Sequence, residues 1–81
     1  MIRDEILPSG NIVNVLQIGQ LIKNKRKELG ITQKDAASMC NIGTRFFSEL
    51  ERGKKTLQIG LVLKVLQDFG FVLDIVERHE K

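Results

Sequence analysis

The chain has 81 residues, of which 42% are hydrophobic and 28% charged, and its formal net charge is +3. This length suits one small domain, and the composition is that of a folded globular chain, which excludes a disordered protein. The opening residues lack the apolar segment of a signal peptide, and no apolar run is long enough to cross a bilayer. We therefore expect a cytoplasmic protein without a membrane partner.

The single cysteine and the single histidine, Cys40 and His79, exclude two further classes. One cysteine cannot form an internal disulfide, and these two residues do not make the ligand set of a metal site. We expect Cys40 to be a small buried side chain. The sequence also lacks a catalytic His–carboxylate or Cys–His arrangement, so we expect no enzyme, no cofactor and no small-molecule partner.

Helical spacing begins after an N-terminal arm, residues 1–13, in which a Pro-Ser-Gly stretch marks a turn. From Asn14 onward, apolar residues recur on one face of a helix, and Gly30 is its expected C-cap. The apolar residues of this face are Val15, Ile18, Leu21, Ile22 and Leu29. Basic residues in the last turns suit the helix dipole, so part of that cluster has a purely structural explanation.

Two short helices joined by a tight turn follow. Thr32 with Asp35 resembles a capping box and predicts the start of one helix. Asn41 accepts a left-handed conformation at low cost and predicts its end. The next helix is expected to begin after Gly43 and to run to Gly53.

A fourth helix is predicted from near Thr56 to Gly70, because apolar residues recur between them at helical spacing. After Gly70 the spacing of apolar residues changes from helical to alternating. In "FVLDIVERHEK", Phe71, Leu73 and Ile75 alternate with the residues between them, which predicts a strand of about six residues. The strand has no evident partner in its own chain, and an unpaired apolar strand requires one.

The two short helices together show the helix-turn-helix pattern. Ala36 and Ala37 are small enough for a close helix crossing, Asn41 provides the turn, and Phe47 and Leu50 anchor the second helix from its inner face. In such a unit the second helix enters the major groove of DNA with its N-terminal residues at the base edges. The spacing therefore predicts a DNA-binding domain.

The outer face of that second helix carries the expected base-reading residues, Thr44, Arg45, Ser48 and Glu49. Arg45 can contact guanine with two hydrogen bonds, Glu49 can accept from a cytosine amino group, and Thr44 can offer a hydroxyl or a methyl group. The alternative is an ordinary surface on which Arg45 and Glu49 form an ion pair. Phe46 lies between the core and this face, and we favour a peripheral core position for it.

A further set of residues is predicted to contact phosphates. Gln33 combines a polar side chain with the start of a helix, which suits a phosphate oxygen, and basic residues would position the protein without reading sequence. These basic residues are Lys23, Arg26, Lys34, Arg52, Lys54 and Lys55.

Residues 18–70, about two-thirds of the chain, resemble the Xre/Cro-type helix-turn-helix domains. The resemblance rests on "KNKRKELGITQ", "RFFSELERGK" and "LVLKVLQDFGFVLDI", and the last of these narrows it to the HipB-type antitoxin regulators. It implies a mainly α-helical, lambda-repressor-like bundle of four to five helices. The helix-turn-helix domain would span residues 14–70, and a dimerisation strand and tail would span 71–81.

The resemblance also implies a function. A homodimer, paired through a strand that includes Phe71, Leu73 and Ile75, would bind a palindromic operator and repress its own operon. It would also bind and neutralise a HipA-like kinase toxin. The sequence departs from the family where Asn41 replaces the usual glycine and where Lys55 replaces a frequent proline.

Two alternatives keep the same fold. One is a plain Xre/Cro-type repressor without a toxin partner, and the other is a protein-interaction module that does not bind DNA. The cationic residues around Arg45 favour DNA binding over the interaction module. A kinase-like reading frame next to the gene would favour the antitoxin over the plain repressor.

Overall fold

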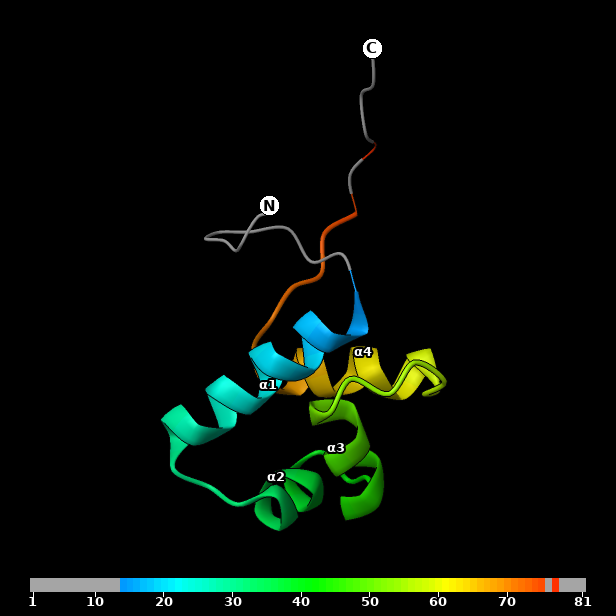
Figure 1. The fold of residues 1–81 in the computed structure, drawn as a ribbon. Helices are drawn as coiled ribbons and strands as arrows, with labels where there is room; N and C mark the ends of the chain where they lie inside the picture. Colours follow the sequence, from blue (N-terminus) through cyan, green and yellow to red (C-terminus); the bar gives the residue numbers. More distant parts are fainter. Residues whose placement is uncertain (1–13, 76, 78–81) are drawn as a thin grey trace.

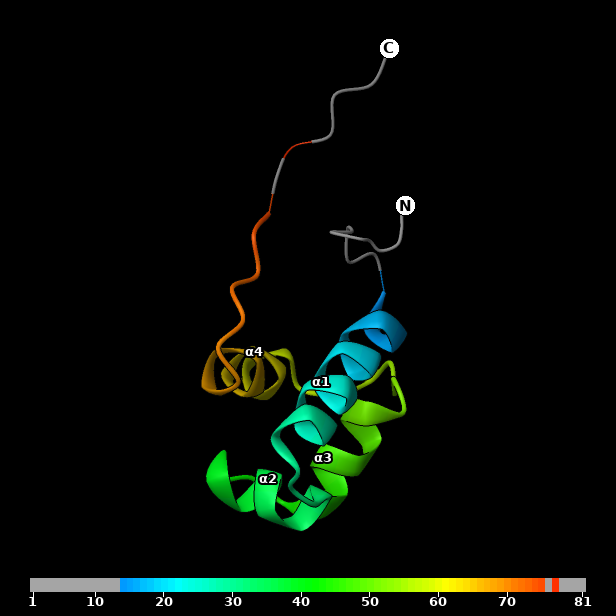
Figure 2. The same ribbon diagram turned by 90° about the vertical axis from the view of Figure 1, so that its left-hand side faces the viewer.

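The computed structural model describes residues 14–75 and Glu77. The predicted N-terminal arm, Val76 of the predicted strand and the tail from 78 to 81 lie outside the described residues. In the described part of the chain, α1 and α4 lie above α2 and α3 (Figures 1 and 2). The helices are α1 (Val15–Leu29), α2 (Gln33–Met39), α3 (Thr44–Glu51) and α4 (Ile59–Asp68). This confirms a mainly α-helical fold, with four helices in the described residues.

The helix boundaries follow from side-chain caps and left-handed residues. Asn14 Oδ1 accepts a hydrogen bond from the backbone N–H of Gln17 at 2.9 Å and caps α1. Thr32 Oγ1 accepts from the backbone N–H of Asp35 at 3.0 Å and caps α2, as its spacing predicts. Gly30 adopts a φ of 71° at the end of α1, which confirms it as the C-cap.

The turn between α2 and α3 has the predicted geometry. Asn41 has a φ of 58°, and the N–H of Ile42 donates to the carbonyl of Ala37 at 2.9 Å. After α3, Gly53 adopts a φ of 78°, and the chain turns toward α4. The start of α4 was predicted near Thr56, but the helix begins three residues later, at Ile59. The intervening residues span the distance from α3, and Leu57 packs against the core before the helix starts.

The core fills the space between the helices. Phe47 is fully buried, and its ring centroid lies 5.9 Å from that of Phe69. Phe46 is partly buried against this core, which confirms its predicted peripheral position. Leu29, predicted on the buried face of α1, is 50% exposed and is the last residue of that helix. The buried hydrophobic side chains are Ile18, Ile22, Ala36, Ala37, Cys40, Phe47, Leu50, Val62, Val65, Leu66 and Phe69.

Cys40 lies in this core, at the C-terminal end of α2. Its side chain is fully buried, as predicted, and burial raises the pKa of its thiol. Lys64 of α4 donates from Nζ to the backbone carbonyl of Cys40 at 2.6 Å and to Asp68 at 2.8 Å. The lysine therefore joins α4 to the end of α2.

The predicted C-terminal strand does not form in residues 71–75. A strand requires a neighbouring segment to accept its hydrogen bonds, and this segment leaves α4 and runs away from α2 and α3 (Figure 1). Phe71 alone is tied to the domain, through its N–H to the carbonyl of Leu66 at 2.8 Å and through packing against the core. Val72 and Ile75 are 91% and 89% exposed.

Candidate nucleic-acid interface

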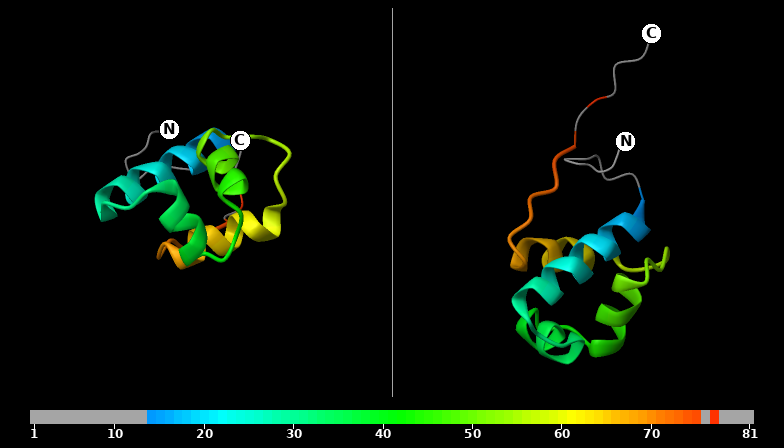
Figure 3. Two further views of the ribbon diagram at one scale, coloured as in Figure 1. Left: turned by 90° about the horizontal axis from the view of Figure 1, so that it is seen from below. Right: turned by 60° about the vertical axis from the view of Figure 1, so that its left-hand side comes forward.

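The outward face of α3 is the candidate site. Seen from below, α2 and α3 lie in front of the other two helices (Figure 3, left). Phe47 and Leu50 are buried on the inner side of α3, as predicted, which turns Thr44 and Arg45 to the solvent. Ser48 is partly exposed one turn further along. The structure therefore places these residue types on one accessible face of α3, a helix in the lower part of the molecule (Figure 1).

A close helix crossing fixes α3 from behind. A Cβ atom built on Gly19 of α1 would lie 2.3 Å from the carbonyl oxygen of Leu50 and 2.8 Å from that of Glu51. No larger residue fits there without moving the backbone, so glycine allows α1 to contact the last turn of α3 directly. Gly19 thus helps set the angle at which α3 presents its outer face.

A buried ion pair joins the same two helices. Arg26 Nε donates to Glu51 Oε2 at 2.6 Å, and its Nη2 donates to Glu51 Oε1 at 3.1 Å. The side chains are only 12% and 2% exposed. Gln33 at the start of α2 donates from Nε2 to Glu51 Oε1 at 2.8 Å, and Arg26 Nη1 donates to the carbonyl of Ile31 at 2.9 Å. One carboxylate therefore links α1, α2 and α3.

The hydrogen bonds in this cluster shift the ionisation of both charged groups. Burial raises the pKa of the Glu51 carboxyl, but hydrogen bonds from Arg26 and Gln33 and the charge of Arg26 outweigh it, so the pKa lies below its ordinary value. The hydrogen bond to Glu51 raises the pKa of Arg26. Both groups therefore stay charged at neutral pH and satisfy one another.

This placement changes the expected phosphate contacts. Arg26 was predicted to contact phosphate, but its side chain is only 12% exposed and each of its three nitrogens donates inside the protein, so we leave it out of the proposed DNA contacts. The side-chain amide nitrogen of Gln33 is also engaged, with Glu51. Lys34, Arg52 and Lys55 are exposed, and Lys23 is partly exposed. Arg52 donates to Ser48 Oγ at 2.9 Å, next to the proposed reading face.

Glu49 lies between two cations on the surface of α3. Its Oε2 accepts from Arg45 Nε at 3.4 Å and from Lys54 Nζ at 3.3 Å. The hydrogen bond from Lys54 contributes most to a lowered pKa of the Glu49 carboxyl, with Arg45 adding to it. The ion pair considered from the spacing of Arg45 and Glu49 is therefore present, and it includes a third residue.

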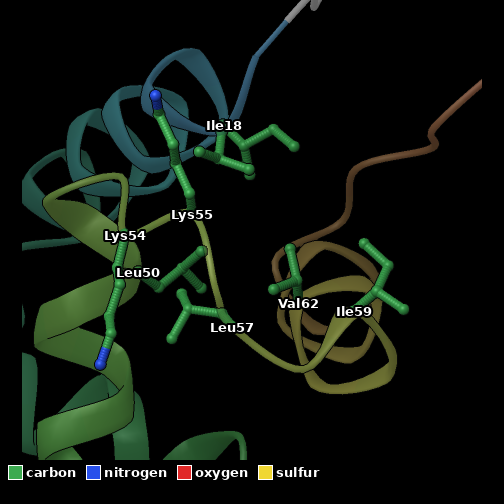
Figure 4. Close-up of a pocket in the computed structure, with 8 residues that line it drawn as sticks. Ile18, Leu50, Lys54, Lys55, Leu57, Ile59 and Val62 are labelled. Carbon is green, nitrogen blue, oxygen red and sulfur yellow. The ribbon is translucent and has the colours of Figure 1, made fainter.

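The segment after α3 covers a small apolar cavity of about 200 Å³. Leu50 and Leu57 face this cavity from one side, and Val62 of α4 from the other (Figure 4). Lys54 extends back along α3 in this view, while Lys55 points toward the start of α1. Both lysines line the cavity, and the backbone N–H of Lys54 donates to the carbonyl of Glu49 at 3.1 Å, which holds it at the end of α3.

Two short helices joined by a left-handed turn, with a buried inner face and an exposed polar outer face on the second, define a helix-turn-helix DNA-binding regulator. The comparisons with known proteins agree. The helix-turn-helix family HTH_3 matches residues 22–73, and the chain belongs to this family, whose members are DNA-binding regulators and not enzymes.

The chain is also similar to individual proteins. An "Uncharacterized HTH-type transcriptional regulator y4mF" from Sinorhizobium fredii (strain NBRC 101917 / NGR234) is 44% identical over 64 residues, which cover 79% of this chain and 84% of the relative. Among solved structures, a chain of the "HipA-HipB-O2-O3 complex" superposes with a TM-score of 0.74 and one of the "HipB-O4 20mer complex" with 0.73. Both are 20% identical, over 85% of this chain and 97% of theirs. At this identity they show a shared fold.

Within the described residues, no helix is long and apolar enough to cross a membrane.

Proposed function

We propose that this regulator is a sequence-specific repressor that binds a palindromic operator as a homodimer. The observation that carries the proposal is the accessible face of α3, on which Thr44 and Arg45 are exposed while Phe47 and Leu50 hold the helix from behind. Arg45 is the main candidate for a base contact, because its guanidinium can form two hydrogen bonds to guanine. Thr44, Ser48 and Glu49 complete the proposed reading face.

Exposed cations around this face support the proposal. Lys34 lies in the first turn of α2, Lys55 follows α3, and the partly exposed Lys23 lies on α1, so phosphate contacts would come from several elements. Arg52 and Lys54 are exposed near the end of α3, although each also contacts a neighbouring side chain. Such contacts would position α3 in the groove without reading the sequence.

The geometry of the C-terminal segment is compatible with a dimer. Residues 71–75 run away from α2 and α3, so a second copy can pair there without covering the reading face (Figure 2). Val72 and Ile75 are almost fully exposed, and Leu73 is 42% exposed. Phe71 packs against its own core instead, so we leave it out of the proposed interface. Pairing would turn the segment into the strand that its alternation predicts.

The DNA-binding part is tested by fluorescence anisotropy. The purified protein is titrated into a duplex taken from upstream of its own gene and into a scrambled duplex, across a series of salt concentrations. We expect a clear preference for the native duplex and an affinity that falls steeply with salt. Equal, weak binding to both duplexes would rule out sequence-specific recognition and favour the interaction module.

We further propose that the repressor acts as the antitoxin of a HipA-like kinase. The superposition with HipB supports this through the fold alone, and the name of the relative, an HTH-type transcriptional regulator, fits a repressor with or without a toxin partner. Co-expression with a kinase-like protein encoded beside the gene distinguishes the two. A stable complex and relief of kinase toxicity are expected for the antitoxin, and neither is expected for a plain repressor.

A further inference from the structure

We infer that Glu49 governs base recognition by positioning Arg45, and that it does not itself contact a base. The inference rests on the proposed function of α3 and changes the role assigned to one of its residues. The two side chains lie one helical turn apart, and Glu49 Oε2 accepts from Arg45 Nε at 3.4 Å.

The exposure of the two side chains indicates which one reaches outward. The Arg45 side chain is 91% exposed, whereas that of Glu49 is only 15% exposed. The glutamate therefore lies low on the helix surface, among its neighbours, and the arginine extends past it. In a groove approached by this face, the arginine would meet the base edges first.

The bonding pattern leaves the arginine able to recognise a base. Only Nε of Arg45 contacts Glu49, and within the described residues no hydrogen bond uses its two Nη atoms. A guanidinium held through Nε can still direct both terminal nitrogens at O6 and N7 of guanine. Holding the side chain in this way also reduces the rotamer freedom that it loses on binding.

Lys54 keeps the glutamate in place from the other side. Its Nζ donates to Glu49 Oε2 at 3.3 Å, and its backbone N–H donates to the Glu49 carbonyl at 3.1 Å. The carboxylate is thus held by both cations, and its charge is balanced where DNA phosphates would otherwise repel it. Both donors contact Oε2, and because the side chain is only 15% exposed, the carboxylate lies below the arginine, away from the amino group of a cytosine in the groove.

The experiment compares base preferences measured with a pool of duplexes randomised around the preferred operator. The proteins are the wild type, Glu49→Gln, Arg45→Ala and the double variant. A full bidentate contact discriminates by about 1–3 kcal/mol, or about 5- to 150-fold. We expect Glu49→Gln to prefer the same base as the wild type at every position of the operator. At the one position where Arg45→Ala no longer discriminates between bases, Glu49→Gln should discriminate about threefold less than the wild type, or weaker still. The double variant should discriminate no worse there than Arg45→Ala alone.

Asp68→Asn is the matched control, because it removes a carboxylate from another i,i+4 ion pair, on α4. Its base preferences should equal those of the wild type. Thermal unfolding of each variant checks that the fold is retained. A second readout needs no DNA: the Arg45 Nε–H proton, observed by NMR, should exchange with water faster in Glu49→Gln than in the wild type.

Four results would overturn the inference. A switch from cytosine toward adenine at one position in Glu49→Gln would show that Glu49 reads a base directly, since glutamine pairs with adenine. Additive losses in the double variant, or unchanged preferences in Glu49→Gln, would show that the two residues act independently. A wild type without base preference would refute the proposed function itself, and the inference with it.

Discussion

At the scale of single residues, the Glu51 carboxylate of α3 joins three helices through its hydrogen bonds. It is only 6% exposed, yet it accepts hydrogen bonds from Arg26 and Gln33. A buried carboxylate without such partners would strongly destabilise a domain of this size. The cluster thus makes the position of α3 depend on one ion pair that DNA does not touch in our proposal.

We expect Glu51→Gln to lower the free energy of unfolding by about 2–4 kcal/mol, because it leaves the charge of Arg26 buried without a counterion. Urea denaturation at neutral pH measures the change. Glu28→Gln, at the exposed pair with Lys25, is the control and should change the value by less than about 1 kcal/mol. A loss equal to that of the control would mean that the ion pair contributes no more than a surface pair.

The same variant has a distinct pH dependence. The pKa of Glu51 is lower in the folded state than its ordinary value of 4.5, so its contribution to stability is present above that value and is lost as the pH falls through the folded-state pKa. The stability difference between the wild type and Glu51→Gln should therefore shrink below about pH 4.5. A difference that stayed constant down to pH 2 would contradict this assignment.

The sequence pattern did not predict that two charged residues, Arg26 and Glu51, are buried in the core. Arg26 lies four residues after buried Ile22, and Glu51 lies four residues after buried Phe47, so each shares the inner face of its helix. That spacing could have indicated that both residues face the core. It was missed because an isolated arginine or glutamate is usually solvated, and only the packing of α1 on α3 shows that these two meet.

At the scale of the elements, the crossing of α1 and α3 determines how the reading face is presented. Gly19→Ala should lower the free energy of unfolding by about 1–3 kcal/mol, because its Cβ would press on the last carbonyls of α3. Gly60→Ala in α4 is a matched control, since nothing lies within 4 Å of a Cβ there. It should be neutral or gain up to about 1 kcal/mol from its better helix propensity. Chemical denaturation measures the free energy of unfolding of both variants. Similar changes in the two would show that the helix crossing tolerates a methyl group.

The helices were largely predictable, because their ends depend on local residues. Thr32, Asn41 and Gly30 act through backbone geometry that a short stretch of sequence already determines. The start of α4 and the crossing at Gly19 depend on how distant segments pack, so local pattern could not locate them. The strand was predicted from its alternation, but alternation cannot supply the neighbour that a strand needs. The outward direction of Thr44 and Arg45 was predictable, whereas the position of Lys54 beside Glu49 was not.

At the scale of the whole molecule, α3 lies in the lower part of the fold, and the exposed C-terminal segment leaves from the upper part (Figure 1). Ile75→Asp should weaken self-association at least tenfold, because it buries a charge in the proposed strand pair. Sedimentation velocity across a concentration series measures the effect. Ser38→Asp, at an exposed position of α2, introduces the same charge and should leave association unchanged. An intact Ile75→Asp dimer would locate the interface elsewhere.

The net positive charge of the molecule predicts a salt-dependent affinity for any DNA. Lys34→Ala should weaken binding to native and scrambled duplexes alike and reduce the slope of log affinity against log salt by about 0.9. Lys27→Ala, which removes an exposed lysine of α1 outside the proposed contacts, is the control. Anisotropy titrations give the slope for each variant. A slope for Lys34→Ala equal to that for Lys27→Ala would remove Lys34 from the proposed phosphate contacts.

The buried thiol of Cys40 can serve as a probe of transient opening of the core around the end of α2. The sequence contains no other cysteine, and because this thiol is fully buried at the end of α2, a reagent reaches it only when the core opens there. The rate at which a thiol reagent modifies the native protein therefore reports how often that opening occurs. If α2 is held against phosphates, modification should slow in the presence of operator DNA. The rate of Cys40 modification, measured with and without operator DNA, would then report DNA binding through its effect on the opening of the core.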